Sequence, residues 1–349
     1  MKNKLNILIT TVGGMTSPDI LRAYKDCDEF EINLIGVDAF EFAVGKKFVD
    51  IFELSPNSVV NEKLFVEFIQ EMVKKYKVDV VIPCGNEDNL ALSKYSELVS
   101  CKIMVSSYDS LIKAYDKGTV YKELTEHMPE HAPRYEIVNN YEQFMISIKK
   151  LGYPNNKVVI KPRFGRGGRG VYILCNKFNF QNVFESKPIT EYPLEFFEKI
   201  LRDENKFDDL IIMEYLDEPY YSVYSISNNG ENIFSLNHIR EWGNASQTFR
   251  GRVCYDVKIE NLAAKIIEKF NLSYTNNIEL ATSSDGRIVL FDLNPRIGAS
   301  SGIDKDIGFN FPLEALKLLL GSNITVDKSK FEKPKIFLRY FDQVWDHND

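Results

Sequence analysis

Two carboxylates, Glu279 and Asp292, lie on the two arms of a predicted β-hairpin. Residues 277–296 alternate apolar with polar or small residues on both sides of Asp285 and Gly286, which is the period of a strand. An Asp-Gly pair between two such arms is a strong signal for a two-residue loop. That loop places Glu279 directly across from Asp292, where like charges destabilise a sheet unless a cation lies between them.

Amide side chains on the same hairpin add to these two carboxylates. The same register sets Asn277 across from Asn294, so two carboxylates and an amide oxygen share one face of the hairpin. Such a set suits a hard ion such as Mg²⁺, which takes oxygen ligands and shares them with nucleotide phosphates. Arg296 follows at once and has the charge to meet phosphate. We therefore expect a metal site here, and the alternative is a solvated sheet face.

A glycine loop is the second candidate for chemistry. Residues 158–162 and 171–174 have the apolar pattern of short strands, and residues 164–170 between them read Phe-Gly-Arg-Gly-Gly-Arg-Gly. Glycines let backbone N–H groups approach a phosphate closely, and Lys161 and the loop arginines add positive charge. The pattern GxxxxGK[ST] is absent, so this is not a Walker A loop. The alternative is a hairpin tip with solvated arginines.

Three arginines, Arg240, Arg250 and Arg252, are concentrated in a short stretch of an otherwise net acidic chain. Arginine pairs well with carboxylate and phosphate groups, so these side chains are candidates for holding an anionic substrate. Ordinary surface salt bridges explain their presence equally well. Both interpretations stay open at the level of the sequence.

The composition is that of an ordinary globular protein, with 44% hydrophobic and 27% charged residues among 349. Lys and Arg number 43 against 50 for Asp and Glu, and the net charge of −7 argues against a generic nucleic-acid binder. Five scattered cysteines without a CxxC pair indicate reduced thiols and a cytoplasmic protein. Apolar runs stay short of 18 residues and no secretory leader is visible, so we expect no membrane span.

The elements that must position these residues begin with a Rossmann-like segment. Short apolar strands at 5–10, 32–37, 78–83 and 103–105 alternate with helical patterns, which predicts a parallel sheet with helices on both faces. Ligands of such sheets bind beyond the carboxyl ends of the strands. The residues expected at that edge are Thr11–Met15, Asp38 and Gly85–Asp88. The absence of GxGxxG argues against a dinucleotide.

The remaining chain mixes helices and strands. Residues 108–150 have a mainly helical pattern, and strands are expected at 210–214 and 221–227 and a helix at 257–270. His127 and His131 have the spacing of metal ligands on a helix. Prolines at 129 and 133 disfavour a helix there, so exposed histidines are the expectation.

Put in order, these pieces resemble an ATP-grasp protein, and in particular single-domain proteins similar to the carbamoyl-phosphate synthase large chain. The resemblance covers nearly the whole chain and rests on four motifs in the expected order. They are Asp116-Lys117, Val159-Ile160-Lys161-Pro162 with its glycine loop, Met213-Glu214-Tyr215-Leu216, and Asn277-Ile278-Glu279 with Phe291-Asp292-Leu293-Asn294-Pro295-Arg296. It implies an N-terminal Rossmann-like pre-ATP-grasp domain (residues 1–107) followed by a two-lobed ATP-grasp fold, α/β and α+β, with lobes at 108–215 and 216–349.

The resemblance also implies roles for individual residues. Lys117 and Lys161 match lysines that contact ATP phosphates, and Glu279, Asp292 and Asn294 match Mg²⁺ ligands. Arg296 matches the arginine that stabilises the transferred phosphoryl group. Residues 164–170, with Arg166, Gly167 and Gly168, match the loop that closes over the phosphates. Glu214, with the backbone of Tyr215 and Leu216, matches the hinge that reads adenine.

Two positions depart from the family pattern. The carboxylate that usually holds the ribose hydroxyls is replaced by Tyr220, and Glu218 is the candidate substitute. Tyr224 stands where the family often has Asp. In addition, the metal position usually held by Glu is Asp292, one methylene shorter, which Mg²⁺ ligation tolerates.

These observations predict an ATP-dependent carboxylate–amine ligase that forms ADP and phosphate. ATP and Mg²⁺ (or Mn²⁺) are the expected cofactors, and Arg296, Lys161 and Arg252 the expected catalytic residues. A small carboxylate and an amine are the expected partners, with no nucleic acid and no membrane, and a homodimer by analogy. Phosphorylation of an acceptor such as carbamate, and a catalytically silent nucleotide-binding regulator, are the alternatives.

Overall fold

The structure is a computed structural model that describes residues 2–165, 168–176, 190–204, 206–243 and 247–345. The chain forms two compact units. The first unit comprises Met1–Ala114, Tyr221–Ile278 and Asn294–Asp349, and the second comprises Tyr115–Tyr220 and Glu279–Leu293. Each unit is therefore built from segments that are separated in the sequence.

A five-stranded parallel sheet opens the first unit. Its strand order is β3-β2-β1-β4-β5. The strands are β1 (Asn3–Thr10), β2 (Phe30–Asp38), β3 (Ile51–Leu54), β4 (Val80–Ile82) and β5 (Lys102–Ile103). The predicted N-terminal parallel sheet is confirmed. β3 was not predicted, because its four residues are half-exposed and lack a continuous apolar run.

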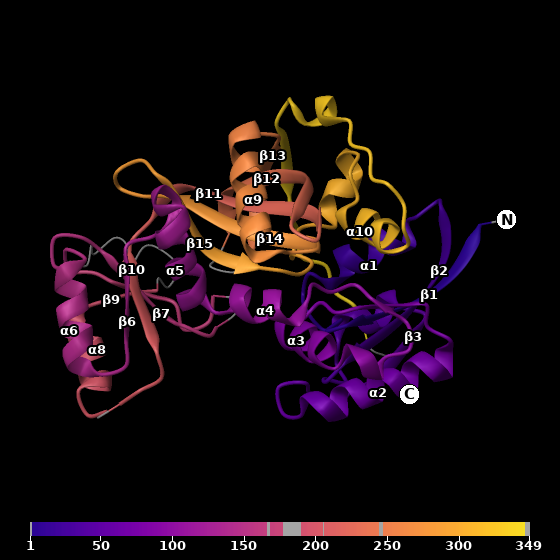
Figure 1. Ribbon diagram of the computed structural model, residues 1–349, viewed down its shortest axis with the longest axis horizontal. Helices are drawn as coiled ribbons and strands as arrows, with labels where there is room; N and C mark the ends of the chain where they lie inside the picture. The colour runs from indigo at the N-terminus through magenta and orange to yellow at the C-terminus, as the bar shows by residue number, and fades with distance from the viewer. Residues whose placement is uncertain (1, 166–167, 177–189, 205, 244–246, 346–349) are drawn as a thin grey trace. The chain divides into compact units, whose positions relative to one another are not determined.

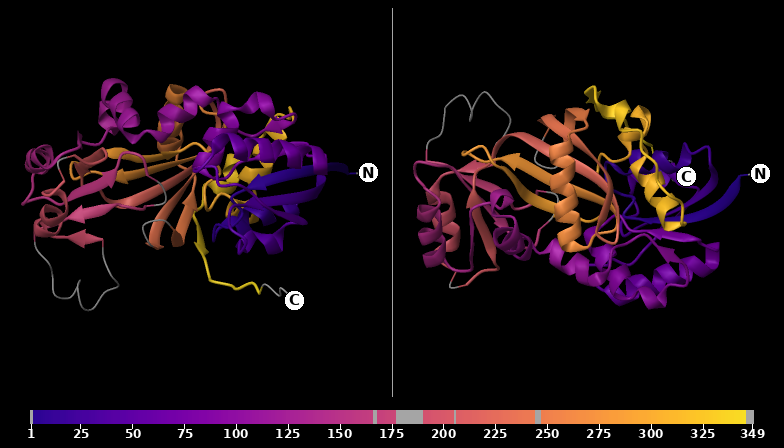
Figure 2. Two further views of the ribbon diagram at one scale, coloured as in Figure 1. Left: turned by 90° about the horizontal axis from the view of Figure 1, so that it is seen from below. Right: turned by 45° about the horizontal axis from the view of Figure 1, so that its top comes forward.

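Helices cover this parallel sheet, as the indigo and purple segments of Figures 1 and 2 show. They are α1 (Ser17–Lys25), α2 (Glu62–Tyr76) and α3 (Asn86–Lys94), and α4 (Tyr108–Tyr115) follows β5 in the sequence. The apolar side of α2 packs with buried residues of β1, β2 and β4 in one core cluster, among them Phe65, Ile69 and Val81. Asn61 caps the first turn of α2 by accepting from the N–H of Leu64, and Lys77 ends the helix in the left-handed region.

A six-stranded sheet has the order β15-β14-β11-β12-β13-β16. Its strands are β11 (Asp217–Asn228), β12 (Glu231–Gly243), β13 (Thr248–Cys254), β14 (Tyr274–Thr282), β15 (Ile288–Asn294) and β16 (Lys335–Leu338). In the first unit α9 (Val257–Phe270) runs across this sheet (Figure 2), and α10 (Phe311–Leu319) follows it in the sequence. Asp256 caps α9 by accepting from the N–H groups of Lys258 and Ile259.

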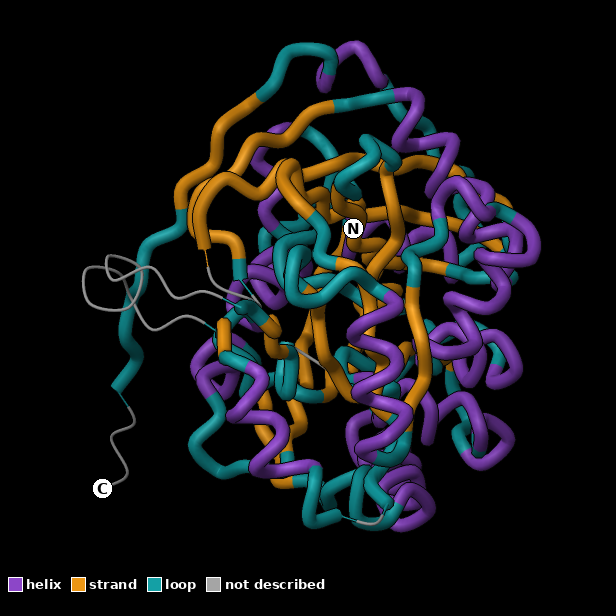
Figure 3. Tube along the Cα trace, turned by 90° about the vertical axis from the view of Figure 1, so that its left-hand side faces the viewer, coloured by secondary structure: helices purple, strands orange, loops and turns teal. Residues whose placement is uncertain are grey.

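The second unit contains a five-stranded sheet of order β6-β10-β7-β8-β9. The strands are β6 (Tyr135–Val138), β7 (Val158–Pro162), β8 (Tyr172–Leu174), β9 (Glu191–Tyr192) and β10 (Leu210–Glu214). The helices are α5 (Lys117–His127), α6 (Tyr141–Lys150) and α8 (Leu194–Leu201). α6 and α8 pack against the sheet through a cluster that includes Phe144, Ile160 and Phe197 (Figures 1 and 3). β6 interrupts a stretch for which a mainly helical pattern was predicted.

The described residues also form short 3₁₀ helices. They span Val44–Phe48, Ser96–Leu98, Pro129–His131, Ile303–Ile307 and Lys328–Phe331. All five cysteines are free thiols. In the part of the chain that the structure describes, every helix is too short or too polar to traverse a lipid bilayer.

Candidate functional site

The second unit brings together the two lysines that were predicted to contact phosphate. Lys161 lies near the end of β7 and is 5% exposed, and Lys117 is the first residue of α5. The Nζ atom of Lys161 donates to the Tyr121 hydroxyl at 2.7 Å and to the Phe291 carbonyl oxygen at 2.9 Å. Two neutral oxygens therefore hold the Lys161 side chain.

Burial and the carboxylate of Asp292 have opposite effects on the protonation of Lys161. Burial lowers the pKa of Lys161 to about 7, while Asp292 opposes that shift and Lys117 adds to it. The Nζ atom of Lys117 lies 3.2 Å from Asp292 Oδ1 and donates to the Gly165 carbonyl oxygen at 2.8 Å. Burial also raises the pKa of Tyr121, so its phenol stays neutral and donates to the Phe291 carbonyl oxygen at 2.6 Å. Two cationic side chains and one carboxylate thus converge.

An ion pair that the sequence did not reveal supports the Lys117 end of this cluster. Arg163, two residues after Lys161, binds Asp116, and it also reaches Asp209 at 2.9 Å. Asp116 in turn caps α5 by accepting from the N–H of Gly118 at 3.0 Å. A side chain at Gly118 would place its Cβ 2.8 Å from Arg163 Nε, so the guanidinium lies directly over the first turn of the helix.

The glycine loop is described only in part. Gly165 accepts from Lys117, and Gly168 has a φ of 70°, a conformation that glycine adopts without cost. Arg166 and Gly167, which the resemblance assigns to the phosphates, lie outside the described residues. The loop therefore stays a prediction except for the contact of Gly165 with Lys117.

The turn of the β14–β15 hairpin differs from the predicted one. Ser283 N–H donates to the Arg287 carbonyl oxygen at 2.9 Å, and Gly286 N–H donates to the Ser283 carbonyl oxygen at 2.9 Å. Ser283 thus pairs with Arg287 across a three-residue loop, in which Gly286 has a φ of 84°. The predicted two-residue loop is wrong, because a three-residue turn with glycine in the left-handed position is also favourable here. A shift of one residue changes which side chains face each other, so the opposition of Glu279 and Asp292 stays a prediction without support from the turn.

The predicted metal ligands lie on this hairpin. Glu279 and Asp292 belong to the second unit, and Asn294 ends β15 in the first. Asp292 and Asn294 are alternate residues of one strand and therefore lie on one face of it. The donor set of two carboxylates and an amide oxygen fits a hard divalent cation. The ammonium of Lys117 beside Asp292 shows that this carboxylate attracts a cation in the folded chain.

Arg296 is held within the first unit. Its Nε donates to Asn86 Oδ1 at 2.6 Å, its Nη1 to the Ile297 carbonyl oxygen at 2.8 Å, and its Nη2 to Asn294 Oδ1 at 3.3 Å. Asn86 begins α3, at the carboxyl edge of the parallel sheet. Arg296 is thus fixed beside the edge at which a small-molecule site was predicted.

The polar residues of that edge bind one another. The buried carboxylate of Asp88 accepts from Thr10 and Thr11 at 2.5 Å each and from Ser58 at 2.6 Å. Asp38 accepts from the Gly13 N–H at 2.6 Å. A Cβ on Gly13 would lie 2.8 Å from Asp38 Oδ2, so only glycine fits this approach. These acidic groups therefore shape the loops of the edge.

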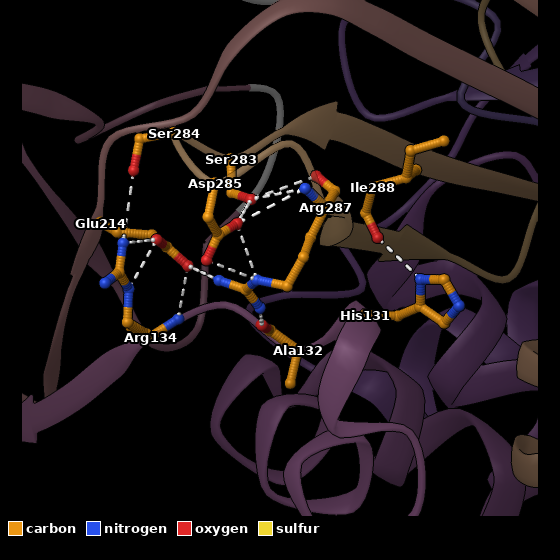
Figure 4. A network of polar contacts seen from close by, with 9 residues as sticks. All are labelled: His131, Ala132, Arg134, Glu214, Ser283, Ser284, Asp285, Arg287 and Ile288. Carbon is orange, nitrogen blue, oxygen red and sulfur yellow. Dashed lines mark hydrogen bonds and ion pairs between the residues drawn. The ribbon is translucent and has the colours of Figure 1, made fainter.

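The predicted adenine hinge follows β10. The Glu214 side chain is buried and binds Arg134 and Arg287, as Figure 4 shows. Leu216 is buried, and its carbonyl oxygen accepts from the Tyr220 hydroxyl at 2.7 Å. The residue found in place of the ribose carboxylate thus binds the hinge itself. Glu218, the candidate substitute, is exposed at the start of β11.

The three arginines of β12 and β13 lie in the first unit. Arg252 binds Glu241 at 2.6 Å, and Arg250 binds the same carboxylate at 3.3 Å. Both arginines are about half exposed. Surface salt bridges, one of the two interpretations left open, describe these contacts, and a role of Arg252 toward a substrate stays a proposal. Arg240 is paired with Gly251 in the register of the sheet.

The two histidines do not share a site among the described residues. His131 Nδ1 lies 2.7 Å from the Ile288 carbonyl oxygen, and His127 lies 3.6 Å from Glu123. His131 belongs to a 3₁₀ turn that begins at Pro129, after α5 has ended at His127. Prolines therefore separate the two side chains, as the sequence indicated.

A family profile and a curated relative match the chain. The profile described as ATP-grasp in the biosynthetic pathway with Ter operon matches residues 206–342. The carbamoyl phosphate synthase large chain of Thermotoga sp. (strain RQ2) is 24% identical over 330 residues, covering 88% of this chain and 27% of that protein. The chain thus spans about a quarter of the length of that relative.

Solved structures share the fold over nearly the whole chain. An N5-carboxyaminoimidazole ribonucleotide synthetase in complex with ADP has a TM-score of 0.70 at 18% identity, covering 97% of this chain and 82% of that one. An L-amino acid ligase from Bacillus licheniformis has a TM-score of 0.64 at 14% identity, covering 95% and 77%. The predicted resemblance and fold class are confirmed, and this fold is typical of ADP-forming ligases. The chain has the ATP-grasp fold and distantly resembles the carbamoyl phosphate synthase large chain and the N5-carboxyaminoimidazole ribonucleotide synthetases.

Proposed function

We propose that this protein is an ATP-dependent ligase that activates a small-molecule carboxylate as an acyl phosphate for attack by an amine. The observation that supports it best is the convergence of Lys117, Lys161 and Asp292 within the second unit. Two lysines beside one carboxylate form a place that favours phosphate oxygens together with a cation. The ATP-grasp fold adds the expectation of ADP formation.

The proposed reaction has two steps. A carboxylate oxygen bonds to the γ-phosphorus of ATP while the bond from that phosphorus to the bridging oxygen breaks, so that ADP leaves. The amine nitrogen then attacks the acyl carbon, the carbon–oxygen bond to phosphate breaks, and the nitrogen gives up a proton. Lys117 and Lys161 neutralise phosphate oxygens, and Arg296 stabilises the transferred group. Arg252 is the candidate for orienting the acceptor carboxylate.

The remaining contacts concern the nucleotide and the metal. Glu279, Asp292 and Asn294 would hold Mg²⁺ or Mn²⁺, which when bound neutralises phosphate charge. The main chain of Tyr215 and Leu216 would read the base. Glu218 would reach the ribose hydroxyls. The glycine loop, with Gly168, would cover the phosphates.

The test is turnover of Mg-ATP with pooled small carboxylates and hydroxylamine. Carboxylate-dependent ADP together with a hydroxamate is the expected result, because hydroxylamine traps an acyl phosphate. AMP and pyrophosphate would instead indicate adenylation and would contradict the proposal. ADP formed with carbamate as the acceptor and without hydroxamate would favour phosphorylation of that acceptor.

A nucleotide-binding regulator is the second candidate, and Tyr220 favours it. Its hydroxyl donates to the Leu216 carbonyl oxygen, and burial raises the pKa of the Tyr220 phenol, so it provides no negative charge for ribose hydroxyls. Binding of Mg-ATP without turnover over the whole carboxylate pool would support the regulator and contradict the ligase.

A further inference from the structure

The buried Glu214 carboxylate has its acceptor positions filled by the protein. Its Oε1 atom accepts from the Arg134 N–H at 2.8 Å and from Arg287 Nη2 at 3.1 Å. Its Oε2 atom lies 2.8 Å from Arg134 Nε and 2.6 Å from Arg134 Nη2. A carboxylate has about four lone-pair positions, and four donors occupy them. An adenine amino group could bind this carboxylate only by displacing an arginine.

Arg287 connects Glu214 to the turn of the β14–β15 hairpin. Its Nε lies 2.9 Å from each oxygen of Asp285, and its Nη1 donates to the Ala132 carbonyl oxygen at 2.9 Å. Figure 4 shows its guanidinium between the turn and Glu214. Its side chain is only 25% exposed, against 59% for that of Arg134. Arg287 is therefore the better-shielded partner of the buried carboxylate, and its geometry is fixed from three sides.

The charged groups around Glu214 are equal in number, with two cations and two anions. Arg134 and Arg287 are cations, and Glu214 and Asp285 are anions. Hydrogen bonds from Ser283 and from Arg287 lower the pKa of Asp285 to about 2, so it stays ionised at neutral pH. Removing one cation would leave Glu214 buried with a single, more exposed partner, and this is costly for a buried charge.

Glu214 is the last residue of β10, and the segment Tyr215–Leu216 follows at once. We propose that Arg287 is a positioning residue, which fixes the main chain of Tyr215 and Leu216 for the nucleotide base by anchoring the Glu214 carboxylate. Arg134, the residue before β6, assists. This inference rests on the proposed function, because it assumes that the base of a nucleotide lies against Tyr215 and Leu216.

Arg287 should affect binding of the nucleotide base but not binding of the phosphates, so ligands with and without a base distinguish the two effects. Binding of ADP, GDP and tripolyphosphate, each with Mg²⁺, is measured by calorimetry on the full chain. Arg287→Ala is expected to weaken ADP binding about tenfold and to leave tripolyphosphate binding within about twofold, since the lysines are untouched. Arg287→Lys should restore part of the lost ADP affinity, because lysine keeps the positive charge but lacks the planar guanidinium with its several N–H donors. Glu214→Gln weakens ADP to a similar degree.

The double variant Glu214→Gln with Arg287→Ala is expected to bind ADP no more weakly than the worse single variant, because the two residues act as one unit. Arg202→Ala is the matched control. Arg202 also pairs with a glutamate of the second unit, Glu198, but it lies at the end of α8 and its side chain is 62% exposed. This control is expected to bind all three ligands as the wild type does.

Several results would overturn the positioning role. One is wild-type ADP affinity in Arg287→Ala, and another is an equal loss of ADP and tripolyphosphate, which would indicate general damage to the unit. A changed ratio of ADP to GDP affinity in Glu214→Gln alone would mean that the carboxylate contacts the base. A wild-type protein that binds no nucleotide would contradict the proposed function as well, which keeps the two failures distinct.

Discussion

Arg163 and Asp116 face each other through two hydrogen bonds, 2.7 Å from Nε to Oδ1 and 2.6 Å from Nη2 to Oδ2. This parallel arrangement links the end of β7, which carries Lys161, to the first turn of α5, which carries Lys117. Although burial opposes it, the Arg163 guanidinium lowers the pKa of Asp116, so the pair stays ionised. The Arg163–Asp116 pair thus fixes the two segments that carry the predicted phosphate lysines relative to each other.

Replacing Arg163 with Ala is therefore expected to cost about 1–3 kcal/mol in the free energy of unfolding, because it removes hydrogen bonds to two carboxylates. Tripolyphosphate binding should weaken as well, since Lys117 loses its fixed position. Arg163→Lys should recover little of the stability or the affinity, because a lysine cannot form the two parallel hydrogen bonds of the guanidinium. Denaturant unfolding and calorimetry provide the two measurements, and an unchanged tripolyphosphate affinity in Arg163→Ala would contradict this explanation.

Lys161 predicts a pH dependence of stability. Its pKa is lowered by burial from 10.5 to about 7, so between these values the unfolded chain binds more protons than the folded chain. The cost of burying the ammonium is fully present below about pH 7 and is relieved as the pH rises toward 10.5. Relative to the wild type, Lys161→Met should gain stability at pH 6 and lose most of that advantage by pH 9.5. Melting temperatures across this range test it, and a difference that does not change with pH would contradict the shifted pKa.

Asp292→Asn is expected to abolish turnover, by more than about 100-fold, while the melting temperature stays close to that of the wild type. The change removes a negative charge next to Lys117 and a candidate metal ligand but keeps the shape of the side chain. Arg202→Ala, which removes the surface pair with Glu198, serves as a control outside the proposed ligands. Wild-type turnover in Asp292→Asn would mean that the metal lies elsewhere.

Arg252 and Arg250 offer a matched pair for the acceptor site, since both bind Glu241 and both are about half exposed. If Arg252 orients the substrate carboxylate, Arg252→Ala should raise the KM for the acceptor about tenfold or more and leave the KM for ATP unchanged. Arg250→Ala should change neither. Equal behaviour of the two variants would assign both arginines to surface salt bridges, which contribute little to stability.

The sequence was most informative where apolar periodicity is clear. The parallel sheet follows from short apolar strands, and α9 from its apolar spacing. β3 and β6 were missed because half-exposed strands of four residues have little period to detect. The hairpin turn was predicted one residue too short, because Asp-Gly also fits a three-residue loop with glycine at positive φ.

The contacts of the candidate site were beyond reach of local patterns. Lys161 was found by its motif, but its partner Tyr121 comes from α5 and its partner Phe291 from β15, far along the chain. The same holds for Glu214, whose partners Arg134 and Arg287 lie far from it in the sequence. Side chains that meet only through tertiary packing produce no recognisable local pattern in the sequence.

The division of the chain into units has a consequence for its synthesis on the ribosome. The second unit begins at Tyr115 but is completed by Glu279–Leu293, and these residues arrive after an intervening stretch of the first unit. Lys117 and Lys161 are thus translated well before Phe291 and Asp292, which complete their surroundings. During elongation the nascent lysine pair lacks its carbonyl and carboxylate partners, so the surroundings of the two lysines are completed late, although the lysines themselves are made early.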